Sequence, residues 1–110
     1  MRKLNQKDIE ILKKLAPEAE KSTQIDYRSI LPPVSMHYAA DEEDFESRLS
    51  RLSTQDMAYL ADRILDGSEC LLCISPEYAR AFLQALERNL SEETAERIRE
   101  LYRSSTGYEA

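Results

Sequence analysis

Residues 75–91 read SPEYARAFLQALERNLS, and this stretch decides the predicted fold. Ser75 is a typical N-cap, Pro76 suits the first helical position, and Glu77 places a carboxylate at the positive end of the helix dipole. The apolar residues that follow recur at the spacing of one helix face: Ala79, Phe82, Leu83, Leu86 and Leu90. Because Ser91 can cap another helix almost at once, the stretch predicts an antiparallel helical hairpin.

Similar start and stop signals recur earlier in the chain. Ser53 can cap the helix that precedes the hairpin, and Gly67 stands where a left-handed residue is expected to end it. Asn5 and Asp41 are the N-caps of two further apolar-periodic segments. Together these signals predict five helices, near residues 6–16, 42–50, 54–66, 76–89 and 92–104.

The composition is that of a mainly helical protein. The chain of 110 residues holds two glycines and no tryptophan, and 42% of its residues are hydrophobic. This is enough apolar material for a folded core, and the length is typical of one domain. We therefore predict a single domain over 1–110, a compact bundle of four or five helices with a flexible tail at 105–110. The helices at 54–66 and 76–89 should bury four residues: Leu60, Ile64, Phe82 and Leu86.

Two short segments leave the fold class partly open. In residues 34–38, Val34, Met36 and Tyr38 alternate with polar residues, a period of two that is typical of a strand. Residues 70–74 form a short continuous apolar run, which is consistent with either a buried strand or a buried connection. If both segments are strands they could pair, which would add a small two-stranded β element to the bundle.

Charge and segment composition argue against several classes. The formal net charge is −6, which disfavours a nucleic-acid partner because phosphate binding needs an excess of lysine and arginine. No run approaches the roughly 18 apolar residues of a membrane span, and no apolar signal core follows the basic start. Two cysteines are too few for a disulfide scaffold. We expect a cytoplasmic protein with reduced thiols and no membrane association.

The leading functional hypothesis is a non-enzymatic protein that acts through protein contacts, with a partner or with a second copy of itself. No catalytic constellation or phosphate loop stands out, so we expect no cofactor. Two charged surfaces are the candidate partner-binding sites. The acidic surface comprises Asp41, Glu42, Glu43, Asp44 and Glu46, and the basic surface comprises Lys3, Lys7 and Lys14.

Two alternatives from other classes stay open. Cys70 and Cys73 have the two-residue spacing that zinc and redox sites use, although two cysteines packed in the core as small apolar residues are the better explanation. His37, the single histidine, is the third candidate ligand. A zinc site would need its ring nitrogens and both sulfurs within roughly 4 Å of one another. The other alternative is nucleic-acid binding through the three lysines of the basic surface.

Overall fold

The computed structural model describes residues 4–18 and 29–110, and this part of the chain folds into six α-helices. In chain order they are α1 (Gln6–Leu15), α2 (Leu31–Pro33), α3 (Glu42–Leu49), α4 (Thr54–Leu65), α5 (Pro76–Asn89) and α6 (Glu92–Thr106). A π-helical turn, Val34–Tyr38, continues α2. The prediction of a compact, mainly helical protein is confirmed, and the radius of gyration is 12.9 Å.

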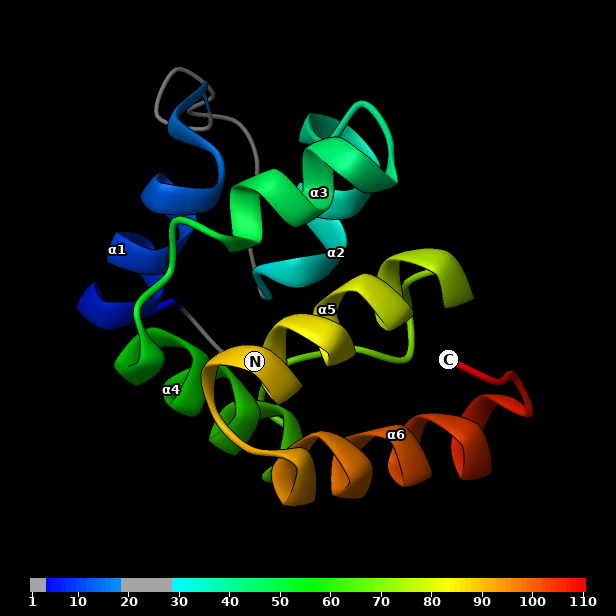
Figure 1. The fold of residues 1–110 in the computed structure, drawn as a ribbon. Helices are drawn as coiled ribbons and strands as arrows, with labels where there is room; N and C mark the ends of the chain where they lie inside the picture. The colour runs from blue at the N-terminus through cyan, green and yellow to red at the C-terminus, as the bar shows by residue number, and fades with distance from the viewer. Residues whose placement is uncertain (1–3, 19–28) are drawn as a thin grey trace.

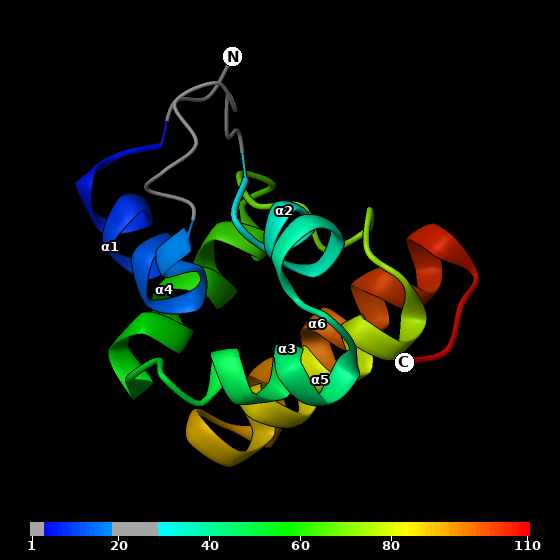
Figure 2. The ribbon, with the colours of Figure 1, turned by 90° about the horizontal axis from the view of Figure 1, so that it is seen from above.

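Helix α5 is the central element of the packing. It forms an antiparallel hairpin with α6 on one side and packs against α3 on the other, while α4 lies against both helices of the hairpin (Figure 1). Helix α1 packs against α3 and lies beside α4 (Figure 2). Between α3 and α5, the rings of Phe45 and Tyr78 meet edge to face with their centroids 5.1 Å apart. The other helices are therefore arranged around the hairpin predicted from residues 75–91.

The five longer helices begin where the sequence places their caps. Asn5 and Ser53 each form a capping box with the aspartate three residues further on. The side chains of Asp41 and Ser91 accept hydrogen bonds from the backbone N–H three residues on. The observed boundaries lie within two residues of the predicted ones, because a cap is satisfied by its own neighbours in the chain.

The predicted core is confirmed at all four named positions. Leu60, Ile64, Phe82 and Leu86 are at most 3% exposed. Each lies on the apolar face that the helical period places toward the other helices. These side chains therefore belong to one continuous hydrophobic core.

The C-terminal helix runs two residues further than predicted. Helix α6 takes in Ser105 and Thr106 and ends at Gly107, whose φ of +80° is the left-handed conformation that glycine adopts without strain. Beyond it, the carbonyl oxygen of Ala110 accepts a hydrogen bond from Arg99 Nε at 3.1 Å. The helix thus occupies the first part of the segment predicted as a tail.

The β element left open for 34–38 and 70–74 does not form, since residues 34–38 form the π-helical turn and no strand occurs in 4–18 or 29–110. Two backbone N–H groups at the start of α2, those of Ile30 and Leu31, donate to the buried carboxylate of Glu69 at 2.8 and 3.1 Å. A carboxylate accepting from a helix start stabilises it, because those N–H groups have no partner within the helix. The cap comes from a residue 39 positions away, so local sequence did not reveal it.

The second strand candidate, residues 70–74, is a loop between α4 and α5. Leu71 and Ile74 are buried, and the backbone N–H of Ile74 donates to the Leu71 carbonyl at 3.2 Å. Leu72 between them is 43% exposed. The turn places Leu71 and Ile74 in the core and leaves Leu72 exposed to solvent. The run is therefore a partly buried connection and not half of a β ladder.

Candidate functional site

The basic surface predicted on the first helix is directed partly into the fold. Lys3 lies outside the described residues. Lys7 and Lys14 donate to the two carboxylate oxygens of Asp56, at 2.7 and 2.6 Å. Asp56 is 1% exposed and also accepts from the backbone N–H of Ser53. The two lysines therefore join α1 to α4, and much of their charge is balanced within the protein.

The Asp56 carboxyl has a strongly perturbed pKa. Burial raises the pKa of this group, but hydrogen bonds from the two lysines and from Ser53 outweigh burial and hold it well below the ordinary value of 3.8. The same contact raises the pKa of Lys7, mainly through its hydrogen bond to Asp56. The Asp56 carboxyl of the folded protein therefore stays ionised at neutral and mildly acidic pH.

We expect Asp56→Asn to lower the free energy of unfolding by about 2 kcal/mol at pH 7, because both lysines lose a charged acceptor. The wild-type carboxylate contributes stability above its ordinary pKa of 3.8 and loses that contribution as the pH falls toward the lower folded-state pKa. The difference between the two proteins should therefore shrink from about pH 4 downward. Urea denaturation followed by circular dichroism at a series of pH values measures it.

The matched control is Asp62→Asn, which removes an exposed carboxylate from the same helix. It should change the free energy of unfolding by less than about 0.5 kcal/mol throughout this pH range. An Asp56→Asn deficit of equal size at pH 7 and at pH 2 would contradict the electrostatic explanation.

The acidic surface is also partly used by the fold. Asp41 caps α3, and Asp44 accepts from the Ala40 N–H at 2.8 Å and from Arg48 Nε at 3.1 Å, which together lower the pKa of Asp44. Glu42 and Glu43 in the first turn of α3 are exposed. A fifth carboxylate, Glu46, lies 3.9 Å from Arg88 of α5. The part that points to solvent for a partner is thus mainly the first turn of α3.

Arg48 joins three separate parts of the chain, a role that the sequence did not reveal. Its guanidinium donates to the carbonyl oxygens of Leu15 and Tyr38 at 2.8 and 3.0 Å. It also contacts both carboxylate oxygens of Glu18, at 2.9 and 3.1 Å, besides its bond to Asp44. The bidentate contact lowers the pKa of Glu18. Arg48 therefore holds the end of α1 and the end of the π-helical turn against α3.

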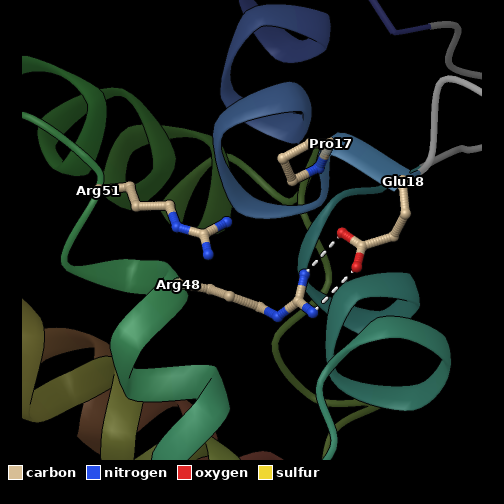
Figure 3. Close-up of a pocket in the computed structure, with 4 residues that line it drawn as sticks. All are labelled: Pro17, Glu18, Arg48 and Arg51. Carbon is tan, nitrogen blue, oxygen red and sulfur yellow. Dashed lines mark hydrogen bonds and ion pairs between the residues drawn. The ribbon is translucent and has the colours of Figure 1, made fainter.

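A hollow of about 360 Å³ lies beside this arginine, lined by Pro17, Glu18, Arg48 and Arg51 (Figure 3). Two arginines at one hollow are a common arrangement for binding an anion. Here, however, every guanidinium nitrogen of Arg48 already donates within the protein, and Arg51 Nη1 donates to the Lys14 carbonyl at 3.1 Å. The hollow is therefore better explained by the structural contacts of Arg48 than by a ligand.

A second hollow, of about 340 Å³, lies between the end of α4, the loop at 66–72 and α6. Its lining is largely apolar and includes Ile64, Leu65, Cys70, Leu71, Leu72, Leu101 and Tyr102. A neighbouring depression shares Leu65 and Leu101 with it and adds Glu93, Glu96, Arg97 and Glu100. We call these two depressions together the α4–α6 groove. Two of its leucines, Leu72 and Leu101, are 43% and 37% exposed.

The wall of the groove is held rigidly by a buried hydrogen bond. The hydroxyl of Tyr102, which is fully buried, donates to the carbonyl oxygen of Ile74 at 2.9 Å. Burial is the main cause that raises the pKa of Tyr102, so the hydroxyl remains a donor. The bond fixes the loop against α6, and both exposed leucines are therefore presented from well-anchored backbone.

Cys70 and Cys73 form a disulfide bridge, with their Cα atoms 6.1 Å apart. This corrects two expectations, that the thiols are reduced and that both are buried core residues. Cys70 is half-buried and lines the groove, whereas Cys73 is exposed. The turn at 71–74 brings the two sulfurs together, a geometry that residue spacing permits but does not require.

The geometry gives the metal alternative little support. His37 is exposed in the π-helical turn, and both cysteine sulfurs are bonded to each other instead of being available as thiolates. Across residues 4–18 and 29–110, no three side chains of the types His, Cys, Asp and Glu are grouped so that they could hold a metal ion.

Comparison with known proteins leaves the site to be interpreted from its own residues. No protein-family model, curated protein or solved structure matches the chain. Among the described helices, none combines the length and the apolar character needed to cross a bilayer. The α4–α6 groove and the disulfide beside it are therefore the features on which a function can be argued.

Proposed function

We propose that this chain is a protein-interaction module whose α4–α6 groove binds a basic amphipathic helix of a partner protein. The observation that carries the proposal is the combination of two exposed leucines, Leu72 and Leu101, with a row of glutamates beside them. It is a binding function and not a catalytic one.

The apolar part of the groove suits the apolar face of a helix. Leu65, Leu72 and Leu101 come from three different elements and line connected depressions. Amphipathic helices bind in such grooves through side chains at the spacing i, i+3, i+4 and i+7. Burying two half-exposed leucines and the facing residues of the partner supplies the favourable free energy of such an interaction.

The charges around the groove favour a basic partner. Glu93, Glu96 and Glu100 line the depression with only one arginine, Arg97, among them. Arg99 contacts Glu96 at 2.6 Å and Arg103 pairs with Glu100, so the charge of these two glutamates is partly balanced and Glu93 contributes most of what remains. The remaining acidic character agrees with the net charge of −6, which would steer a cationic segment toward the protein.

A second copy of the chain fits this surface less well. Symmetric pairing through α6 would place the same glutamate-rich face on both sides of the interface, and like charges close to each other are unfavourable. The exposed Glu42 and Glu43 on α3 would add to the repulsion between copies but to the attraction of a basic partner. We therefore favour a different protein as the occupant over a homodimer.

The proposal predicts selective binding of a cationic amphipathic peptide. A fluorescein-labelled peptide of leucine and lysine, arranged with a helical period, should bind with an affinity at least about tenfold higher than the same design with glutamate in place of lysine. Replacing Leu101 by aspartate should weaken binding of the lysine peptide by about tenfold or more, because it removes a central apolar contact. Fluorescence anisotropy measures both effects.

Met36→Asp is the matched control, because Met36 is 66% exposed and lies outside the groove, on the π-helical turn. It should leave the peptide affinity unchanged. Equal binding of the two peptides, or equal loss in both variants, would overturn the proposal. A dimer in light scattering that Leu101→Asp dissociates would instead make a second copy the occupant of the groove.

A further inference from the structure

We propose that the Cys70–Cys73 disulfide is redox-active and undergoes thiol–disulfide exchange with a dithiol, the sulfur of the exposed Cys73 being the atom attacked. The site is the loop between α4 and α5, at the edge of the α4–α6 groove. The inference stands whether or not the groove holds a partner helix, because it depends on the sulfur atoms and their accessibility.

The bridge contributes little that the loop needs for its fold. It joins residues three positions apart, and in the chain-entropy account so short a loop gains only about 2 kcal/mol, compared with about 3 kcal/mol for a loop of 15 residues. Other contacts hold the same segment. Leu71 and Ile74 are buried, and Tyr102 donates to the Ile74 carbonyl at 2.9 Å. The loop can therefore keep its position when the bridge is reduced.

The two cysteines differ in their exposure to solvent. Cys73 is exposed, whereas Cys70 is half-buried in the lining of the groove. An attacking thiolate must approach a disulfide sulfur from outside, so the exposed sulfur is the one it reaches. Cys73 also lies two residues before Ser75, the N-cap of α5, whose side chain makes no capping hydrogen bond. The uncapped N–H groups of that helix start favour a nearby thiolate over a thiol.

The exchange balances without any further reactant. A thiolate of the dithiol forms a bond to the Cys73 sulfur, the Cys70–Cys73 bond breaks, and its electron pair leaves on Cys70 as a thiolate. The second thiol of the dithiol, as its thiolate, then attacks the mixed disulfide at its own partner sulfur and releases Cys73. The dithiol is oxidised by two electrons, the protein disulfide is reduced by two, and the two thiol protons pass to Cys70 and Cys73.

The first test is reversible titration of the whole chain in mixtures of reduced and oxidised glutathione, followed by alkylation of thiols and gel electrophoresis. The fraction of reduced protein should rise and fall with the composition of the mixture. A bridge that survives a large excess of reduced glutathione, or thiols that never pair in oxidised glutathione, would overturn the proposal. Loss of the helical circular dichroism signal on reduction would also overturn it, because the bridge would then be structural.

The second test identifies the attacked sulfur. In Cys70→Ser the exposed Cys73 remains, and in Cys73→Ser the half-buried Cys70 remains. With oxidised glutathione, Cys70→Ser should form a mixed disulfide about tenfold faster than Cys73→Ser, as mass spectrometry over time can measure. Equal rates, or the reverse order, would contradict the role assigned to Cys73.

Discussion

Replacing Phe82 by alanine should lower the free energy of unfolding by about 3–5 kcal/mol. Phe82 is 0% exposed and lies on α5, the helix that packs against α3, α4 and α6. The truncation loses the transfer free energy of the ring and leaves a cavity that helices anchored on several sides cannot close. For a domain of this size such a loss is a large fraction of the total stability.

Gln84→Ala is the matched control for Phe82→Ala, since Gln84 is exposed on the same helix. It should change the free energy of unfolding by less than about 0.5 kcal/mol. Urea denaturation gives both values. The slope of the free energy of unfolding against urea concentration should be the same in both variants as in the wild type, because this slope depends on the surface area exposed on unfolding. A loss below about 1 kcal/mol for Phe82→Ala would mean that α5 is not the centre of the core.

The second large effect is expected for Arg48→Ala, which should lower the free energy of unfolding by about 3–5 kcal/mol. The substitution leaves the buried Leu15 carbonyl oxygen and the part-buried Tyr38 carbonyl oxygen without their arginine donor, and an unsatisfied buried group costs about 1–3 kcal/mol. The carboxylates of Glu18 and Asp44 are partly exposed, so water can replace the arginine there and they add less.

Two further variants distinguish this contact from a general effect of charge. Arg51→Ala removes a nearby arginine whose side chain is exposed, and it should cost less than about 1 kcal/mol. Arg48→Lys keeps the charge but lacks the planar fork of donors, so it should recover only part of the loss. Full recovery by lysine would show that charge, and not the set of directed hydrogen bonds, is what stabilises the site.

The helices could be predicted because their signals are local. A cap such as Ser53 or Asn5 satisfies N–H groups two or three residues away, and the apolar period that follows has only one helical face to bury. The burial of Leu60 and Phe82 follows from the same period. These features depend on neighbours in the chain, so one sequence is enough to find them.

The candidate site could be predicted only in part. A redox or metal role for Cys70 and Cys73 was among the alternatives, but reduced thiols were expected, because the spacing of two cysteines does not say whether a turn brings the sulfurs together. The charged surfaces were found by composition along the chain, yet Lys7 and Lys14 proved to contact Asp56 of another helix. A sequence gives the number and sign of the charged side chains, whereas the packing of the helices decides how many of these charges face a partner.

Capping residues and the helical period thus settle, from the chain alone, where five helices begin and which faces they bury. The features decided by tertiary structure all join residues distant in the chain. Glu69 caps α2 from 39 positions away, Arg48 joins three segments, and the α4–α6 groove forms where one loop and two helices meet. The physical reason is that a cap or an apolar face acts over one or two helical turns, whereas a buried carboxylate, a guanidinium or a groove takes its partners from whatever the packed helices bring near.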